Sequence, residues 1–445
     1  MRTTSFFLGL GLAGVTTLGA CGDDNGNSPP APDAAVADAP PVAVTCAADN
    51  GGLTLPTGFC ATIFADHVGK ARHIAVTPMG RVFVAVQPSM PTATDGHVLA
   101  LYDADNDGVA EDTTTFGTFG GNGIAWQDGV LYLAADDRIV RFNVPDGRST
   151  PTSPTPSVIV GNLPAEPDHT AKTVVVRGAS MFVNIGSASN ACQVKNRELH
   201  SPGVDPCPEL ETRAGIWQFS LATTNIDPIG TRVATGVRNG NALAIDPASD
   251  TLWAAVNGRD QLHENWPEQF TVTEDNLRPS EELVAIKPGV DRGWPYCYHD
   301  PVARQMKLAP EYGGDGEMQG RCATIAEPPV AIPAHAAPLA IAFARGTQFP
   351  AAYRNGVFIA NHGSRFDTDA AAADLHGYDV QFASFADGQP TGSLEKFATG
   401  FDAGMRPLPD AAPHRPVGLA MMPDGSLLIG DDKGGRIWRV FYKAP

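Results

Sequence analysis

The segment ALAIDPASDTLWAAV (242–256) contains an apolar run, a turn that carries Asp, and a second apolar run that ends in small residues. Two apolar runs that flank such a turn predict a β-hairpin. A single hairpin is barely stable, whereas hairpins repeated radially close a ring and leave only short protected edges. The chain repeats this pattern in five more places, HIAVTPMGRVFVAV (73–86), GIAWQDGVLYLAA (123–135), TVVVRGASMFVNIG (173–186), AIAFARGTQFPAAYRNGVFIAN (340–361) and GLAMMPDGSLLIGD (418–431). Six repeats predict an all-β fold, a six-bladed β-propeller with long inter-blade loops.

The two ends of the predicted propeller indicate how its ring closes. FCATIFA (59–65) has no hairpin partner nearby, and the chain ends on a second isolated strand, RIWRVFY (436–442). We therefore expect these two strands to pair within one blade. Most of the surplus chain lies in residues 257–339, and long loops on a rigid β-scaffold often carry function. No helical period of useful length and no Walker, GxGxxG or GxSxG motif is present.

The N-terminus has the features of an exported lipoprotein. Residues 1–20 begin with Arg2, continue with the apolar run Phe6–Leu18 and read as a signal peptide. Leu-Gly-Ala-Cys, ending at Cys21, forms a lipobox in which the cysteine is acylated; a plain cleaved signal is the alternative. Residues 21–45 predict a disordered tether before a propeller over 46–445. Gly22 favours the outer membrane, so we expect a lipid-anchored, periplasm-facing protein of the cell envelope.

The composition supports this interpretation and excludes one class of partner. The chain has 47 Gly and 38 Pro but only 18% charged residues, a balance typical of turn-rich β proteins. Its net charge is −18 without any Lys/Arg cluster, which argues against nucleic acid.

The cysteines provide independent support for export. Of seven cysteines, six remain after Cys21, an even number in an oxidising compartment. Their local pairings are Cys46–Cys60, Cys192–Cys207 and Cys297–Cys322, although spacing alone leaves the connectivity open. The chain has no CxxC arrangement, which argues against metal binding by these residues.

Polar residues outside the strand pattern indicate a site. In PDHTAK (167–172), His169 is a candidate general base and Asp168 could orient it; a loop histidine without catalytic role is the alternative. Arg238 and Asn239 precede the fourth repeat and suit a ligand with carboxylates, unless the arginine braces neighbouring loops. The carbonyl oxygens around Gly258 could face a hard cation.

Taken in order, the motifs of the chain resemble one family. They are PDHTAK before MFVNIGSASN (181–190), ATGVRN (234–239), NGRD (257–260), GWPYCY (293–298), ANHGS (360–364) and RPVGLAMMPDGSLLIGDD (415–432). Together they resemble the soluble quinoprotein glucose dehydrogenase and sorbosone dehydrogenase family, from about Thr57 to Tyr442. The resemblance implies a propeller that binds pyrroloquinoline quinone (PQQ) and Ca²⁺ and oxidises a sugar, polyol or sugar aldehyde.

The resemblance also implies roles for individual residues. It makes His169 the base, Asp168 its orienting carboxylate, Arg238 and Asn239 the pair beside the quinone, Gly258 and Arg259 the carbonyl ligands of calcium, and Arg415 a cationic partner of the cofactor. The chain departs from the family pattern in two places. ANHGSRFD (360–367) lacks the expected lysine, so His362 or Arg365 would replace it, and Arg259 stands in place of a proline.

A further acidic segment, DADNDGVAED (103–112), resembles the start of a calcium loop. Asp103, Asp105 and Asp107 precede Gly108, but the twelfth position carries Thr114 instead of the bidentate Glu. A blade-edge turn, with or without a bound Ca²⁺, fits the segment equally well.

Three classes of function compete for this sequence. The first is a PQQ-dependent sugar dehydrogenase with a small sugar-like substrate and a respiratory electron acceptor. The second is a non-catalytic propeller lipoprotein that binds a glycan or a protein. The third is a metal-dependent propeller lactonase, which would need several convergent carboxylate or histidine ligands, and the repeats contain no such set.

Overall fold

The computed structural model describes residues 44–90, 93–224, 230–363, 376–392, 394–404 and 411–443. These residues belong to one compact unit, Val42–Pro445. The signal segment, Cys21, the tether up to residue 43 and Arg365 lie outside the described residues, so the predictions made for them stay predictions. Among the helices that the model describes, none is long and apolar enough to cross a membrane.

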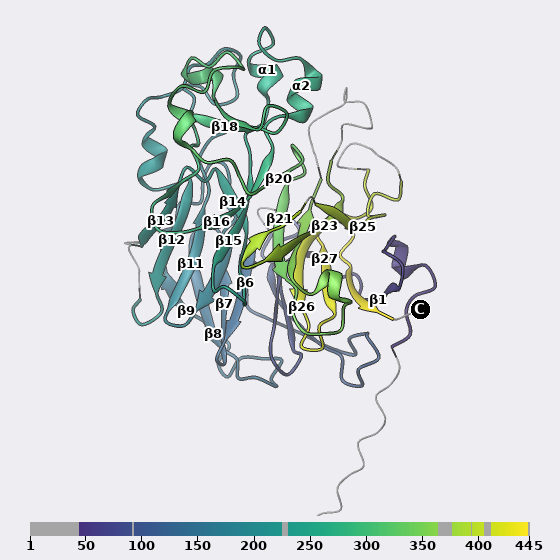
Figure 1. The fold of residues 1–445 in the computed structure, drawn as a ribbon. Coiled ribbons are helices and arrows are strands. Elements are labelled where there is room, and N and C mark those ends of the chain that lie inside the picture. The colour runs from purple at the N-terminus through teal and green to yellow at the C-terminus, as the bar shows by residue number, and fades with distance from the viewer. Residues whose placement is uncertain are drawn as a thin grey trace, which may run out of the picture. The chain divides into compact units, whose positions relative to one another are not determined.

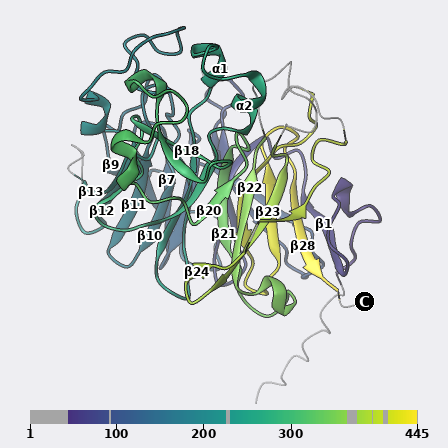
Figure 2. The ribbon, with the colours of Figure 1, turned by 45° about the horizontal axis from the view of Figure 1, so that its top comes forward.

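The described chain forms six antiparallel blades that close into a ring (Figures 1 and 2). The innermost strand of each blade packs against that of the next blade, and β26 packs against β2. The strands, blade by blade, are β2 (Lys70–Val76), β3 (Val82–Gln87), β4 (His97–Tyr102) and β5 (Asp112–Phe116); β6 (Gly123–Gln127), β7 (Val130–Ala134), β8 (Ile139–Asn143) and β9 (Ser157–Val160); β10 (Val174–Arg177), β11 (Ser180–Ile185), β12 (Gly215–Ser220) and β13 (Thr231–Thr235), with β17 (Val290–Asp291) parallel to β13; β14 (Asn239–Ile245), β15 (Leu252–Asn257), β16 (Glu281–Ile286) and β20 (Val330–Ile332); β21 (Pro338–Phe343), β22 (Gly356–Asn361) and β23 (Asp379–Ala386), with β24 (Gln389–Pro390) and β25 (Glu395–Ala398) both on β23; and β26 (Pro416–Met421), β27 (Leu427–Asp431), β28 (Ile437–Tyr442) and β1 (Phe59–Ala65). The predicted all-β six-bladed propeller is confirmed.

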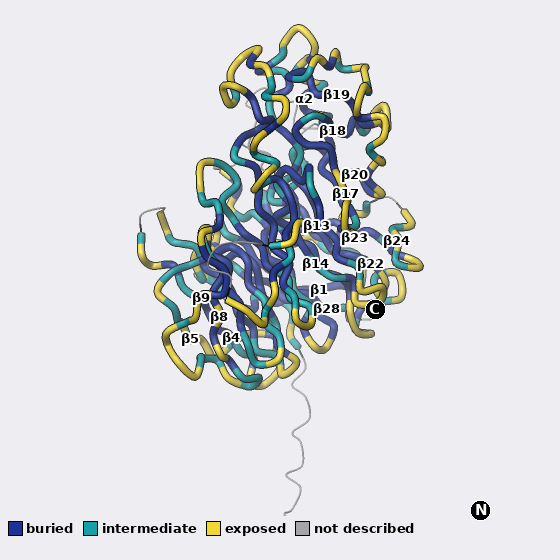
Figure 3. Tube along the Cα trace, turned by 90° about the vertical axis from the view of Figure 1, so that its left-hand side faces the viewer, coloured by how far each residue is buried: buried dark blue, intermediate teal, exposed yellow. Residues whose placement is uncertain are grey.

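Each of the six quoted segments forms the two innermost strands of a blade. The hairpin β14–β15, for example, pairs Ala242 with Ala255 and Ala244 with Trp253. Apolar side chains from these strands pack between neighbouring blades, where Trp253 and Phe358 are fully buried. Figure 3 shows the result as buried strands surrounded by exposed loops. The local hairpin pattern therefore also defines the core.

The ring closes as the two ends of the propeller predict. Strand β1 pairs with β28, so Cys60 lies opposite Phe441 and Thr62 opposite Arg439. The three expected disulfides, Cys46–Cys60, Cys192–Cys207 and Cys297–Cys322, are all present.

A cap covers one end of the blades, formed by residues 187–213, 258–280 and 292–326 (Figure 1). It contains helices α1 (Leu262–Asn265) and α2 (Val272–Leu277) and the hairpin of β18 (Cys297–Asp300) and β19 (Gln305–Leu308). The long loops were expected over 257–339, but residues 187–213 contribute as well. The helices were not expected because four and six residues are too short to give a helical period.

The acidic turn between β4 and β5 ties two blades together. Asp103 is buried, accepts a hydrogen bond from the Gly108 N–H at 3.0 Å and forms an ion pair of 2.6 Å with Arg439 of β28. Glu111 joins Asp103, Asp105 and Asp107 in one cluster, although sequence reasoning assigned it no role. Calcium binding at this turn stays a prediction.

The ring closure generates a stability prediction. Trp438 on β28 is fully buried, its indole N–H donates to the Gly51 carbonyl at 3.0 Å, and its ring packs edge-on against Phe401. We expect Trp438→Ala to lower the free energy of unfolding by about 3–5 kcal/mol through the cavity that it leaves. Urea unfolding measures this, with Met79→Ala at an exposed position as the control. An unchanged midpoint for the tryptophan variant would contradict the closure.

Candidate active site

Polar residues near the start of four innermost strands, or immediately before these strands, meet at the mouth of the ring. The Arg72 Nε donates to Asn122 Oδ1 at 2.8 Å, and the Asn122 amide reaches the Thr173 hydroxyl and Asn241 Oδ1 at 3.2 and 3.3 Å. These residues come from four different blades, so one polar layer crosses the mouth. Most of the residues predicted for the site lie in or beside this layer.

His169 lies in the loop between β9 and β10, in a conformation that a neighbouring glycine permits. Its backbone is left-handed, with φ of 49°. It sits directly against Gly186, at which a Cβ atom would lie only 2.5 Å from the His169 Cβ. Lys172 stabilises the same loop, because its buried ammonium donates to the carbonyl oxygens of Pro164, at 2.8 Å, and Thr170.

The contacts of the His169 ring define its tautomer. Nδ1 lies 3.0 Å from the Ser187 carbonyl oxygen and 2.9 Å from the Ser187 Oγ. A carbonyl oxygen only accepts, so Nδ1 carries the hydrogen and Nε2 keeps its lone pair. Burial, together with the nearby Arg238 guanidinium, lowers the pKa of His169 to about 3. The imidazole is therefore neutral at pH 7 and has the electronic form of a general base.

Asp168 does not orient this ring, and that prediction is wrong. Its carboxylate is one-third exposed, lies 3.8 Å from the Arg197 Nε and accepts from the Asn196 amide at 3.3 Å. The left-handed backbone at His169 brings the imidazole against Ser187, whereas the preceding carboxylate contacts the cap.

Arg238 lies inside the structure rather than on a ligand surface. Its guanidinium donates to the Asn190 carbonyl and Oδ1, both at 3.0 Å, to Asp260 at 2.9 Å and to the Gly258 carbonyl. The side chain is only 4% exposed. Arg238 therefore braces the cap against the propeller, the alternative that its sequence context left open.

Asp260 completes this arrangement and was assigned no role from the sequence. Besides Arg238 it accepts from Arg197 at 3.2 Å and faces the His335 ring at 3.9 Å. Burial alone would raise the pKa of Asp260, but Arg238, His335 and Arg197 lower it to about 2. The carboxylate is ionised at neutral pH and compensates the surrounding positive charge.

The predicted calcium ligands are the carbonyl oxygens of Gly258 and Arg259. The Gly258 carbonyl lies near the mouth but accepts from Arg238, and its N–H donates to Glu281. The side chain of Arg259 turns away and pairs with Glu311 inside the cap. Other oxygens are better candidates for a cation, because among the described residues the buried Oδ1 atoms of Asn239 and Asn257 have no hydrogen-bond partner.

A second charged group faces the mouth from the blades on the other side. Asp432 accepts from Arg72 at 2.5 Å and from the His362 Nε2 at 2.8 Å. Arg415 donates to the carbonyl oxygens of His362 and Gly363 at 3.0 and 2.7 Å. The predicted residues Arg415 and His362 thus lie together. They are joined by Asp432, the last residue of the motif that begins at Arg415, and by Arg72, which lies in no quoted motif.

Glu281 generates a pH-dependent prediction. Burial raises its pKa to about 7, against the opposing effects of the Gly258 N–H, His335 and Arg238. The pKa of Glu281 is higher in the folded than in the unfolded chain. Its contribution to the free energy of unfolding is therefore fully present below pH 4.5 and falls by roughly 3 kcal/mol as the pH rises to 7. Glu281→Gln should remove that part of the decline in unfolding free energy between pH 4.5 and 7. The exposed Glu327→Gln is the control, and equal slopes in both variants would contradict the assignment.

Comparisons with known proteins place this geometry in context. The sequence is 25% identical over 413 residues to an uncharacterized protein of Borreliella burgdorferi, covering 90% of this chain and 94% of that protein. The fold matches the iodide structure of a Trichoderma reesei protein of Carbohydrate-Active Enzymes Family AA12 with a TM-score of 0.72, at 20% identity over 90% of this chain and 98% of the other.

Two further solved structures contain the cofactor that the motifs imply. The holo form of the PQQ domain of a Coprinopsis cinerea pyranose dehydrogenase matches with a TM-score of 0.69, at 17% identity over 87% of this chain and 97% of that one. The PQQ-bound aldose sugar dehydrogenase of Streptomyces coelicolor matches with a TM-score of 0.52, at 16% identity over 87% and 99%. The predicted likeness to soluble quinoprotein sugar dehydrogenases is thereby confirmed. Because the family model described as TrAA12-like matches residues 53–443, the chain belongs to the TrAA12-like family.

Proposed function

We propose that this protein is a dehydrogenase that uses PQQ to oxidise a hydroxyl group of a sugar, polyol or sugar aldehyde, with His169 as the general base. The observation that carries the proposal is the state of His169, a neutral imidazole whose Nδ1 is held by Ser187. Its Nε2 has no hydrogen-bond partner among the described residues. The cofactors of the structural relatives support the same chemistry.

The residues at the mouth fit a cofactor with three carboxylates. Arg72, His362 and Arg415 supply positive or hydrogen-bonding groups on one side, and Asn239 presents a buried amide oxygen without partner on the other. Arg72 and Arg415 would hold the carboxylates, with His362 in the role expected of a lysine. Asn239 would lie beside the quinone.

Calcium is proposed with a revised ligand set. The unpartnered Asn257 oxygen and the Gly258 carbonyl are hard oxygen donors of the kind that Ca²⁺ prefers. The Arg259 carbonyl stays a prediction. Arg238, whose hydrogen bonds are directed into the structure, would fix the position of Gly258 rather than contact substrate.

PQQ, when bound, supplies a quinone that accepts hydride, and a bound cation would make it more electrophilic. The protein would contribute the base and its orientation. His169 Nε2 would accept the hydroxyl proton of the substrate, and the Ser187 carbonyl and Asp260 would then stabilise the positive imidazolium. Asp168 and Arg197, which are partly exposed, would contact sugar hydroxyls.

Reconstitution of the purified chain with PQQ and CaCl₂ tests the proposal. We expect dye reduction with aldoses, and a loss of roughly 10²–10⁴-fold in kcat for His169→Ala because a general base contributes about that much. His200→Ala is the matched control, since that histidine is exposed and pairs with Glu268. If sugars or proteins bind without any turnover, the chain is a non-catalytic binding propeller and the proposal fails.

The anchor at Cys21 is a separate proposal, supported by the lipobox and by the pairing of the six other cysteines in disulfides. A lipid-anchored, periplasm-facing enzyme would transfer electrons to a respiratory acceptor and contact the membrane only through its lipid. Cys21→Ser should move the protein from the membrane fraction to the soluble fraction, as cell fractionation measures. A variant that stays in the membrane fraction would contradict the anchor.

A further inference from the structure

One peptide group lies between His169 and a carboxylate of the cap. The Ser187 carbonyl accepts the Nδ1–H of His169 at 3.0 Å. The N–H of the same peptide belongs to Ala188 and donates to Glu209 Oε2 at 2.6 Å. The imidazole and the Glu209 carboxylate therefore bind the two ends of one peptide dipole.

The second oxygen of Glu209 holds the neighbouring residue. Glu209 Oε1 accepts from the Ser189 hydroxyl at 2.5 Å, and the Ser189 carbonyl accepts from the Ser187 hydroxyl at 2.7 Å. That hydroxyl is the other group in contact with His169 Nδ1, at 2.9 Å. Because it donates to Ser189, its oxygen is left to accept from the imidazole. Both partners of the His169 ring are thus held by contacts that lead to Glu209.

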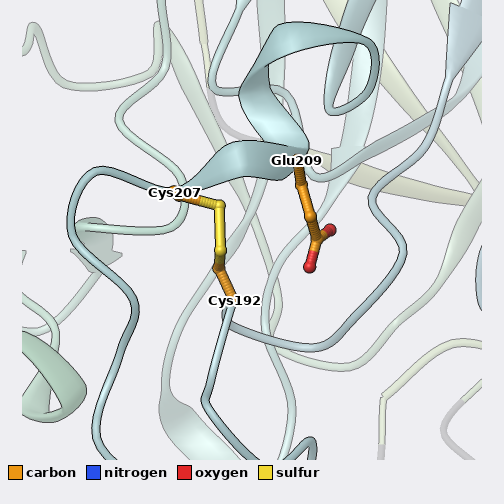
Figure 4. A group of neighbouring side chains, drawn as sticks. All are labelled: Cys192, Cys207 and Glu209. Atoms are coloured by element: carbon orange, nitrogen blue, oxygen red, sulfur yellow. A yellow bond between two sulfur atoms is a disulfide. The ribbon is translucent and has the colours of Figure 1, made fainter.

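A disulfide positions Glu209. The carboxylate lies two residues after Cys207, in a short 3-10 turn over Pro208–Glu211, and Cys207 is bonded to Cys192 (Figure 4). The Cys192 N–H donates to the Ser189 hydroxyl at 2.9 Å. The two sulfur atoms and the Glu209 carboxylate lie within 4.8 Å of one another, but the sulfurs are used in the disulfide and are not metal ligands.

We propose that Glu209 is the positioning carboxylate of the His169 base and acts through the Ser187–Ala188 peptide. A negative charge at the N–H end polarises the peptide and makes its carbonyl a stronger acceptor, since hydrogen bonds in series strengthen one another in a low-dielectric site. The stronger acceptor keeps the hydrogen on Nδ1 and stabilises the imidazolium that forms when Nε2 takes a proton. This inference rests on the proposed function for its catalytic consequence.

The other acidic residues near His169 cannot fill this position. Asp168 contacts Arg197 and Asn196 rather than the ring. Asp260 is bonded to Arg238 and Arg197 and acts on His169 only through its charge. Of the acidic residues near His169, only Glu209 binds the Ala188 N–H and the Ser189 hydroxyl, which adjoin the two Ser187 groups in contact with Nδ1.

The test compares Glu209→Gln with Glu211→Gln, an identical charge change at an exposed position of the same turn. In the full chain without cofactor, ¹⁵N NMR of labelled histidine should show the Nδ1–H tautomer of His169 in the wild type and in the control. In Glu209→Gln we expect a mixture of both tautomers. With PQQ and CaCl₂, kcat should fall roughly 10–100-fold with little change in KM, by analogy with the loss of a hydrogen-bond partner of a metal-bound histidine.

If the Glu209 variant fails to fold, Ser189→Ala and Ser189→Thr provide the same test. The alanine variant should change the His169 tautomer and lower kcat, and the threonine variant, which retains the hydroxyl, should restore both. Folded Glu209→Gln or Ser189→Ala proteins with the wild-type ¹⁵N spectrum would overturn the proposal. A tautomer change in a chain that oxidises no sugar would instead sustain the positioning role and reject the dehydrogenase function.

Discussion

The buried guanidinium of Arg238 is the contact on which the site depends. It donates hydrogen bonds to oxygen atoms of Asn190, Gly258 and Asp260, which belong to two different segments of the cap. Arg238 itself immediately precedes β14 of the propeller. A buried ion pair costs desolvation, and removing one partner leaves a charge that is strongly destabilising. The cap therefore has one favourable position on the blades, and that position determines where Ser187 and Glu209 lie.

Because the cap is held in this position, the two sides of the mouth carry different chemical groups. One side of the mouth, formed by residues before β10 and β14 together with the cap, presents a neutral histidine in a defined tautomer. The other side, formed by Arg72 of β2 and Arg415 before β26 together with His362, presents cations that are partly compensated by Asp432. A base that stays unprotonated and a positively charged wall are the two features that oxidation of an alcohol with an anionic quinone requires.

The fold could be predicted almost completely, because a hairpin such as 242–256 is written in consecutive residues and its six repeats define the ring. The site could be predicted only in part. His169, Arg238 and Arg415 occur in motifs, but the roles of Asp168 and Arg238 depend on which side chains the cap brings to them. Lys172 and Asp260 end the quoted motifs PDHTAK and NGRD, whereas Glu209 lies in none. The roles of all three are hidden from the sequence, since their partners are distant in sequence or are backbone atoms that only the folded loop exposes. A carboxylate two residues after a disulfide cysteine is the one feature that could have directed attention to Glu209.

The central claim is that His169 acts as a base that burial and Arg238 keep neutral, with a pKa of about 3. The pH dependence of kcat/KM for the PQQ-loaded enzyme tests this most directly, because it reports the ionisation of the essential base in the free enzyme. The account predicts no loss of activity from histidine protonation between pH 7 and 5. A fall in kcat/KM at low pH with a midpoint near 6.5, which His169→Ala alone abolishes, would contradict the account. The imidazole would then titrate as an ordinary exposed histidine.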